Sequence, residues 1–214
     1  MCVILICPEK VRPSLETLRR CQHKNPHGAG IAWRENGAVE WFKTNDVSAI
    51  AEQLRRRRGE IVIHFRFASV GPVCGELRHP FPVTRKAALL ERGRGNAVLF
   101  QNGTWLGWRN ALRLAKGKGH RLPDGEMNDA RAAAFLCSLY GPSFLRECGV
   151  SRWVYFSARE TLRFGQWHER DGIYFSNLRW LPPQPDAADD WWDRFTGCWK
   201  TFSIPNQKPT TDLL

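Results

Sequence analysis

A chain of 214 residues with 43% hydrophobic and 25% charged residues has the composition of a globular protein, which excludes a disordered or fibrous chain. Lysine and arginine outnumber aspartate and glutamate by 32 to 21, and the resulting net charge of +11 favours anionic partners without naming one. No apolar run is long enough to span a bilayer and residues 1–8 have no basic leader, so we expect a cytoplasmic protein without a membrane partner.

The cysteine pattern argues against both a disulfide framework and a metal site. Seven cysteines are an odd number, and none of them stands in a CxxC pair. The six histidines show no metal-ligand spacing such as HExxH. We therefore expect reduced thiols, no metal and no cofactor.

The basic residues gather in three parts of the chain. We interpret them as solvated faces, and the alternative is a surface that attracts nucleic acid. No basic segment is interleaved with aromatic residues in a nucleic-acid-binding motif. The clusters are Arg55 to Arg58, then Arg85, Lys86, Arg92 and Arg94, then Lys116, Lys118, His120 and Arg121.

The first third of the chain predicts four strands and one helix. An apolar run closed by Pro8 is typical of a buried strand, and Asn36-Gly37 is a strong hairpin signal between two further strands. Asp46 is a good N-cap for a helix with Ile50 and Leu54 on one face. The expected elements are strands at 2–7, 28–33, 38–43 and 61–66 and a helix from Asp46 to about Arg57.

The rest of the chain predicts a short buried strand, a helix and a closing meander. The strand runs into a turn at 101–103, and the helix stops before Gly141-Pro142. This mixture suits a layered α/β or α+β fold over residues 1–180, with 181–214 as an aromatic and Pro-rich extension packing on it. The elements are strands at 97–100, 153–157, 162–168 and 173–175 and a helix at 129–140.

Cys2 is the first candidate for chemistry. Once the initiator methionine is removed, one carbon carries both the thiol and a free α-amine, whose ordinary pKa is about 7.7–8.0. That amine can serve as the general base for the thiol. The alternative is an apolar cysteine at the start of a buried strand.

Arg66 is a candidate for substrate binding. It stands at the end of a strand and is followed by Ser69 and Gly71. A guanidinium grips a carboxylate bidentately, which suits the α-carboxylate of an amino acid. The alternative is a surface arginine that pairs with a neighbouring acid.

Two further motifs bear on the same chemistry. Asn102-Gly103 ends a buried strand, so the Asn102 side-chain amide and the Gly103 backbone N–H can point at one developing oxyanion, although Asn-Gly is also a common hairpin turn. Asp129 at the start of a helix can bind a substrate ammonium or simply cap the helix.

Taken in chain order, these motifs resemble the class II glutamine amidotransferases, and the likeness covers most of residues 1–180. Each motif is short, and it is the order and spacing of the set that are specific. The set consists of Cys2, residues 28–32, residues 64–66 with Ala68, Ser69 and Gly71, residues 79–81, Asn102-Gly103, Asp129 and residues 171–177.

The resemblance implies an α+β fold, a four-layer αββα sandwich of the N-terminal-nucleophile (Ntn) hydrolase type. It also implies the roles of the matching residues. Cys2 is then the nucleophile with its own amine as base, and Asn102 and Gly103 form the oxyanion hole. The substrate-binding residues are Arg66 for the carboxylate, Asp129 for the ammonium, Ser69 as the small hydroxyl beside the substrate and His79 of the His-Pro-Phe motif.

The chain departs from the family pattern at three places. Gln101 stands where the family usually has histidine before Asn-Gly, Val3 where glycine often follows the nucleophile, and Asn128 where serine or threonine is expected before Asp129. These departures leave the substrate open between glutamine and another γ-glutamyl amide. They also support an alternative function, in which the protein keeps the Ntn fold but is an inactive binding or structural protein. Such a protein could act near nucleic acid.

The expected activity is therefore that of a glutamine amidohydrolase. The Cys2 thiolate attacks the side-chain carbonyl of glutamine, ammonia leaves, and a glutamyl thioester is hydrolysed. The sequence leaves no residues for a synthase domain, so we expect either that a separate protein accepts the ammonia or that the enzyme cleaves another γ-glutamyl amide directly.

Overall fold

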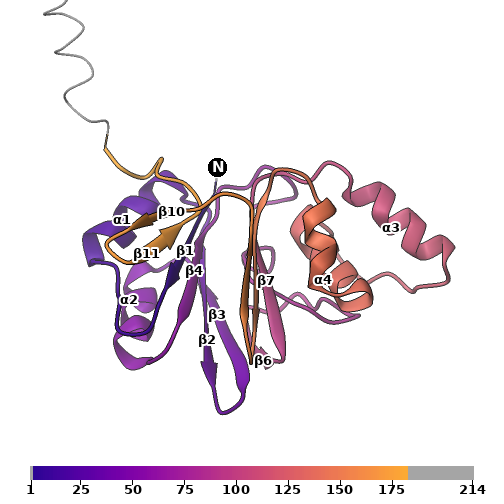
Figure 1. The fold of residues 1–214 in the computed structure, drawn as a ribbon. Helices are drawn as coiled ribbons and strands as arrows, with labels where there is room; N and C mark the ends of the chain where they lie inside the picture. Colours follow the sequence, from indigo (N-terminus) through magenta and orange to yellow (C-terminus); the bar gives the residue numbers. More distant parts are fainter. Residues whose placement is uncertain (1, 183–214) are drawn as a thin grey trace, which may run out of the picture. The chain divides into compact units, whose positions relative to one another are not determined.

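The computed structural model describes residues 2–182, and two antiparallel β-sheets pack against each other at its centre (Figure 1). Side chains from both sheets meet in one buried cluster. Ile4, Ala32 and Val62 come from the larger sheet, and Phe100 and Val154 from the smaller one. The described residues up to Trp180 form a single compact unit.

The larger sheet has seven strands, and its centre is buried on both faces. All five residues of β1 and all five of β4 are buried, which fits their continuous apolar sequences. In spatial order it consists of β10 (His168–Arg170), β11 (Ile173–Phe175), β1 (Val3–Cys7), β4 (Ile61–Phe65), β2 (Ala29–Glu35), β3 (Ala38–Thr44) and β6 (Arg92–Gly95).

The smaller sheet has four strands, in the order β5 (Phe81–Pro82), β7 (Ala97–Asn102), β8 (Arg152–Ser157) and β9 (Thr161–Phe164). Successive residues of β7 face opposite sides, as the pleat requires. Val98 and Phe100 face the larger sheet, whereas Leu99 joins a second buried cluster. Asn102, two residues beyond Phe100, therefore lies on the side of the larger sheet.

Two pairs of helices flank the sheets (Figure 1). Next to the larger sheet are α1 (Leu15–Lys24) and α2 (Val47–Arg56), and next to the smaller one are α3 (Trp108–Gly117) and α4 (Asp129–Tyr140), followed by the 3₁₀ helix η1 (Pro142–Glu147). Leu18 and Cys21 of α1 and Ile50 and Leu54 of α2 are buried. The described chain thus has a mixed α/β organisation.

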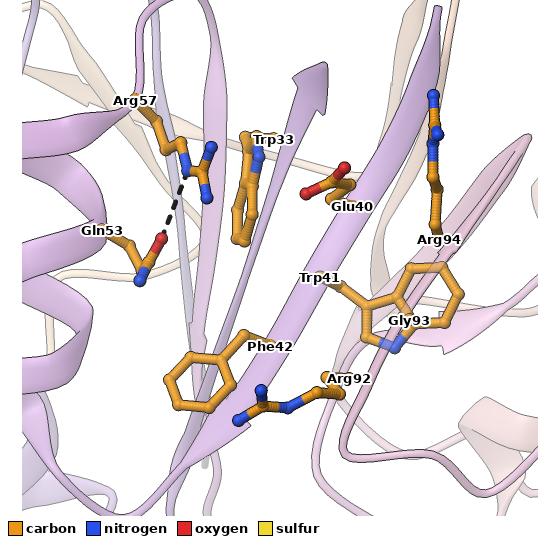
Figure 2. A pocket seen from close by; sticks show the side chains of 9 residues that line it. All are labelled: Trp33, Glu40, Trp41, Phe42, Gln53, Arg57, Arg92, Gly93 and Arg94. Atoms are coloured by element: carbon orange, nitrogen blue, oxygen red, sulfur yellow. Dashed lines mark hydrogen bonds between the residues drawn. The ribbon is translucent and has the colours of Figure 1, made fainter. Parts of the chain in front are cut away.

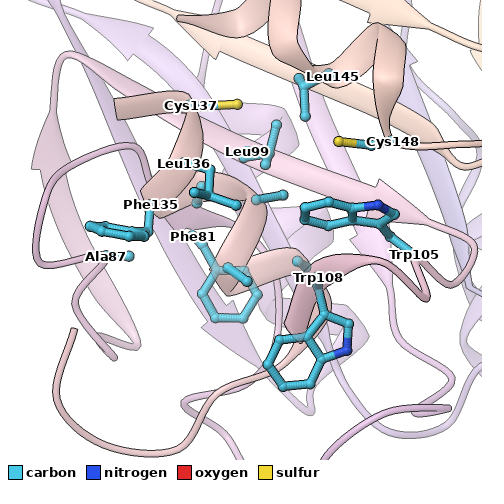
Figure 3. Packing of buried hydrophobic residues seen from close by; sticks show 14 of the residues in the cluster. Phe81, Ala87, Leu99, Trp105, Trp108, Phe135, Leu136, Cys137, Leu145 and Cys148 are labelled. Carbon is cyan, nitrogen blue, oxygen red and sulfur yellow. The ribbon is translucent and has the colours of Figure 1, made fainter. Parts of the chain in front are cut away.

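The second buried cluster fixes α3 and α4 on the smaller sheet (Figure 3). Its largest side chains are aromatic and include Trp105, Trp108 and Trp153. Trp105 and Trp153 meet edge to face with ring centroids 6.5 Å apart. Because α4 starts at Asp129, this packing also fixes the position of that carboxylate.

Most predicted elements in residues 2–182 are confirmed to within a few residues. Asn36 and Gly37 have positive φ angles of 49° and 71°, as a type I′ hairpin turn requires, and Asp46 caps α2 by accepting a hydrogen bond from Ser48 N. The helix predicted over 129–140 is α4.

One predicted strand is wrong, and several elements are additional. The segment 162–168 is not a single strand, because it breaks at Gly165, whose φ is +85°. Its first part belongs to β9 in the smaller sheet, and its last residue begins β10 in the larger sheet. The helices α1 and α3 and the strands β5 and β6 were not predicted. The extension predicted at 181–214 lies, from 183 onward, outside the described residues.

The outer face of the larger sheet carries a hollow of about 480 Å³ near its β6 edge (Figure 2). The Arg57 guanidinium lies 4.5 Å from the Trp33 ring centre, and that of Arg92 lies 5.4 Å from the Phe42 ring centre. Arg57 also pairs with the Glu35 carboxylate.

Within the described part of the chain, no helix is long and apolar enough to cross a membrane.

Candidate active site

The Cys2 sulfur lies at the entrance to β1, next to the segment that follows β4. The backbone N–H of Phe67 donates to Cys2 Sγ at 3.2 Å, and the thiol is 3.3 Å from the Phe67 carbonyl. Because Val3 pairs with Phe65 in the sheet, the sheet register places Cys2 beside the residues that directly follow β4, starting with Arg66. The residue is partly exposed, as a nucleophile must be.

A hydrogen-bond network joins Cys2 to Asn102 through the two residues that directly follow β11. Asn177 Nδ2 donates to the Cys2 carbonyl at 2.7 Å, which fixes the backbone of the candidate nucleophile. The hydroxyl of Ser176 accepts from Ile4 N and from Asn102 Nδ2, both at 2.8 Å. Cys2 and Asn102 are therefore held by neighbouring residues of one short segment.

Asn102-Gly103 is not a hairpin turn. The strand that pairs with β7 at this point is β8, which starts nearly fifty residues later at Arg152. Gly103 has φ +131°, and a β-carbon there would lie 2.6 Å from Ser151 Oγ, so the position requires glycine. Asn102 is fully buried, and its Oδ1 has no hydrogen-bond partner among the described residues.

Arg66 is buried, and its partners are backbone carbonyls. Its guanidinium donates to Pro72 O at 3.0 Å and lies at the 3.5 Å limit from Val70 O and Cys74 O. None of the salt bridges among residues 2–182 involves it, so the surface ion pair considered from the sequence is wrong. Burial lowers the pKa of Arg66, and the Cys2 and Cys74 thiols oppose that shift.

The Asp129 carboxylate is buried and faces the loop that follows β7. Its Oδ2 accepts from Gln101 Nε2 at 2.8 Å and from Trp105 N at 2.9 Å. The cap of α4 is Asn128, whose side chain accepts from Arg131 N, so the capping role considered for Asp129 is wrong. Gln101, which stands where the class II amidotransferase pattern has histidine, makes a direct contact with this carboxylate.

Ser69 links the segment after β4 to the loop after β7. Its hydroxyl lies 3.2 Å from the Thr104 hydroxyl, next to Gly103. Contacts of this kind link six of the seven predicted residues through one or two intervening residues. They are Cys2, Arg66, Ser69, Asn102, Gly103 and Asp129.

His79 is the predicted residue that lies apart from these contacts. It is buried, its ring contacts that of His64 at a tilt with centroids 4.1 Å apart, and neither of its nitrogens has a hydrogen-bond partner among the described residues. A β-carbon on Gly30 would lie 1.8 Å from the His79 carbonyl oxygen, which explains the glycine at that position. Burial, with His64 adding to it, holds the pKa of His79 well below its usual value.

Proton transfer at Cys2 needs a base close to the sulfur. Burial raises the pKa of the Cys2 thiol, while the Phe67 N–H and the Arg66 charge lower it. The described histidines do not hydrogen-bond the sulfur. His27 Nδ1 accepts from Ala68 N, and burial lowers the pKa of His64 to about 3. His27 and His64 are therefore not placed to take a proton from the sulfur.

Sequence reasoning missed three residues that hold the site in place. Ser176 and Asn177 belong to a quoted motif but were given no role, and His27 was not singled out. The His27 ring stacks on Phe67 at 5.2 Å, and its backbone N–H donates to Arg66 O. A signal was present in the Ser176-Asn177 pair, because polar residues directly after a buried strand often bond neighbouring backbone.

The described residues contain no group of three or more side chains suited to hold a metal ion. The six cysteines among residues 2–182 are all free thiols. What the arrangement offers chemically is a partly exposed thiol, a buried amide at a strand end and a buried guanidinium without a carboxylate partner.

No protein-family model and no curated protein matches the chain. Solved structures do. Glutamine phosphoribosylpyrophosphate amidotransferase from B. subtilis, complexed with ADP and GMP, is 14% identical with a TM-score of 0.55. A structure described as the allosteric regulatory enzyme of purine biosynthesis is 16% identical with a TM-score of 0.53.

Each likeness covers 82% of this chain and 41% of the other, so the chain spans less than half the length of these neighbours. Neither description involves nucleic acid, and the nucleic-acid hypothesis gains no support. At this level of identity the likeness concerns the fold. Over most of its length, the chain has a fold found in a glutamine amidotransferase, the class of enzyme that its motifs resemble.

Proposed function

We propose that the protein hydrolyses the side-chain amide of glutamine, or of a related γ-glutamyl compound, through a thioester on Cys2. One observation carries the proposal: the partly exposed Cys2 sulfur accepts a hydrogen bond from Phe67 N, one residue from the carboxylate-free guanidinium of Arg66. The Arg66 charge is close enough to the sulfur to lower the pKa of the thiol, so a nucleophile and a carboxylate-binding group lie together, as the binding of an amino-acid amide requires. The two sheets with their flanking helices are, in this proposal, the four-layer αββα sandwich of the Ntn hydrolases.

The reaction starts with proton transfer from the Cys2 thiol to its own α-amine. The thiolate adds to the amide carbonyl, and the oxyanion is stabilised by the Asn102 amide and the Gly103 N–H. The α-ammonium then gives its proton to the leaving nitrogen, and ammonia departs. Water, deprotonated by the same amine, hydrolyses the thioester to glutamate and regenerates the thiol.

Substrate binding would divide between two buried charges. Arg66 binds the α-carboxylate, and its near-limit contacts leave donors for a better acceptor. Asp129 binds the α-ammonium, since both of its protein hydrogen bonds go to Oδ2 and leave Oδ1 for the substrate. Ser69 contributes its hydroxyl beside them. A separate synthase would accept the ammonia.

The test combines mass spectrometry with an ammonia-release assay. We expect purified protein to lack Met1, to release ammonia from glutamine and to take one equivalent of diazo-oxo-norleucine at Cys2. Cys2→Ala should retain the fold and lose roughly 10³-fold or more of the activity, because the nucleophile is gone.

Cys74 is the internal control for the labelling experiment, since it is the other partly exposed thiol of the described chain. Labelling of Cys74 in place of Cys2, or Met1 retained in active protein, would contradict the proposal. Inactive protein with a free Cys2 amine would favour the binding or structural role.

A further inference from the structure

A second hollow, of about 570 Å³, lies on the α4 side of the molecule, between the loops at 84–91 and 119–127. It is separate from the residues that surround Cys2. Four cationic side chains and one carboxylate line it, together with small and branched apolar residues. The lining consists of Arg85, Lys86, Ala88, Leu89, Arg121, Leu122, Pro123, Asp124 and Arg131.

Arg131 forms side-chain hydrogen bonds with both loops. Its side chain is buried and donates to Ala87 O at 2.8 Å and Lys86 O at 3.4 Å in the first loop. In the second loop it donates to Glu126 O at 2.6 Å and Asp124 O at 2.7 Å. Carbonyl groups satisfy its donors without cancelling its charge, so a full positive charge remains at the base of the hollow.

The charge around this hollow is poorly balanced. Asp124 is its one carboxylate, and it pairs at the surface with Arg121 at 3.2 Å. Arg85, Lys86 and Arg131 form none of the salt bridges among residues 2–182. Mutual repulsion among cations at one place is unfavourable unless an anion joins them.

The loop carrying Arg85 and Lys86 is held in one conformation. Ala87 is fully buried with φ +38°, a left-handed conformation that alanine seldom adopts. Its N–H donates to Thr84 O and Thr84 Oγ1, and its carbonyl accepts from Arg131. A strained residue fixed in this way positions its neighbours before any ligand arrives.

The hollow near β6 provides a comparison within the same molecule. It also contains three arginines, but two carboxylates face them: Glu35 pairs with Arg57, and Glu40 lies between Arg57 and Arg94 (Figure 2). Its charges are therefore compensated to a larger extent than those of the hollow near α4. Basic composition alone does not distinguish the two hollows, whereas charge pairing does.

We propose that the hollow between the loops at 84–91 and 119–127 binds a phosphate monoester with a small apolar body. The doubly charged phosphate lies among Arg85, Lys86 and Arg121, above the charge of Arg131. The apolar part packs on Leu89, Leu122 and Pro123. A volume of about 570 Å³ is in the range of small-molecule sites.

Calorimetric titration of the full chain with phenyl phosphate, at fixed ionic strength, tests this proposal. We expect saturable binding with a Kd of about 1 mM or lower. The double variant Arg85→Gln/Arg121→Gln should weaken binding at least about tenfold, because two charge-assisted contacts are lost. Both residues are exposed, so the variant should fold normally.

The matched control is Arg92→Gln/Arg94→Gln, which removes the same charge from the hollow near β6, where both residues are also exposed. It should change the affinity by less than about twofold. Equal weakening by the two double variants would show general attraction to a basic protein and overturn the proposal. Absence of binding to the wild type, or equal binding of phenol, would overturn it as well.

Discussion

Arg66 and Arg131 are two buried arginines that the fold treats differently. Each of the two residues is 2% exposed. Each guanidinium donates to backbone carbonyls of loops and not to a carboxylate. Arg131 makes four hydrogen bonds, three of them between 2.6 and 2.8 Å. Arg66 makes three, two of which are at the 3.5 Å limit.

The difference separates a structural role from a binding role. A guanidinium has five N–H donors, and a buried one is costly unless those donors are used. Arg131 uses them to hold two loops together. Arg66 has unused donor capacity next to a partly exposed thiol, which is the arrangement that a carboxylate ligand completes.

The largest effect should be the loss of stability in Arg131→Ala. Removing this side chain leaves four buried carbonyl groups without their donor, and the two loops lose their connection. We expect the free energy of unfolding to fall by about 3 kcal/mol, measured by urea denaturation. Arg66→Ala should lose about 1 kcal/mol in the same experiment, since it has one short hydrogen bond to lose.

Arg131→Lys serves as the control, because it keeps the charge but cannot reach four carbonyls at once. Its free energy of unfolding should lie between those of the wild type and Arg131→Ala. Equal destabilisation by Arg66→Ala and Arg131→Ala would remove the distinction between the two arginines.

The next largest expected effect is on the kinetic constants of Arg66→Ala. If Arg66 binds the α-carboxylate, Arg66→Ala should raise KM for glutamine by about 30- to 100-fold, the value of one charge-assisted hydrogen bond of about 2–2.7 kcal/mol. The value of kcat should change by only a few-fold, because the carboxylate is remote from the reacting carbonyl. Steady-state ammonia release measures both constants.

A substrate that lacks the α-carboxylate, 4-aminobutanamide, completes the experiment. The wild type should discriminate strongly in favour of glutamine, and Arg66→Ala should lose most of that discrimination. A large loss of kcat with KM unchanged would assign Arg66 to the reaction itself and contradict the carboxylate role.

Local sequence signals predicted the first part of the fold well. The apolar runs of β1 and β4, the Asn36-Gly37 turn and the Asp46 cap each specify their structure within a few residues. The strand predicted over 162–168 is wrong because apolar residues continue on both sides of Gly165. The left-handed conformation of this glycine ends β9, and the chain then enters the other sheet as β10. The helix α1 was missed because its exposed, charged residues dilute the apolar stripe of Leu18 and Cys21.

The candidate site was predicted through motif order, and its connections were not. Nothing local in Cys2 or Asn102 indicates that both are held by the segment 176–177, because those contacts join residues 175 and 74 positions apart in the sequence. The contact between Gln101 and Asp129 is likewise tertiary. Residue types can be read from a sequence, but hydrogen bonds between distant segments require the fold.

The smallest expected effect is on the pH dependence of stability and concerns Lys43, a buried lysine that can become neutral by losing a proton. Its Nζ donates to Glu76 O at 2.9 Å and lies 4.9 Å from the Phe81 ring centre. Burial lowers the pKa of Lys43 to about 7, with Glu91 opposing the shift and Arg78 adding to it. The unfolded chain has the ordinary value of about 10.4.

Between these two values the unfolded chain binds one more proton than the folded one, so stability should rise as the pH rises from about 7 towards 10. We expect a gain of about 1 kcal/mol for each pH unit in urea denaturation between pH 7.5 and 9.5, relative to Lys43→Met. Lys43→Met is the right reference because it keeps the volume of the buried chain and has no proton to exchange. Parallel curves for the two proteins would mean that Lys43 stays charged when buried, as Arg66 and Arg131 do, and the contrast between lysine and arginine in this core would disappear.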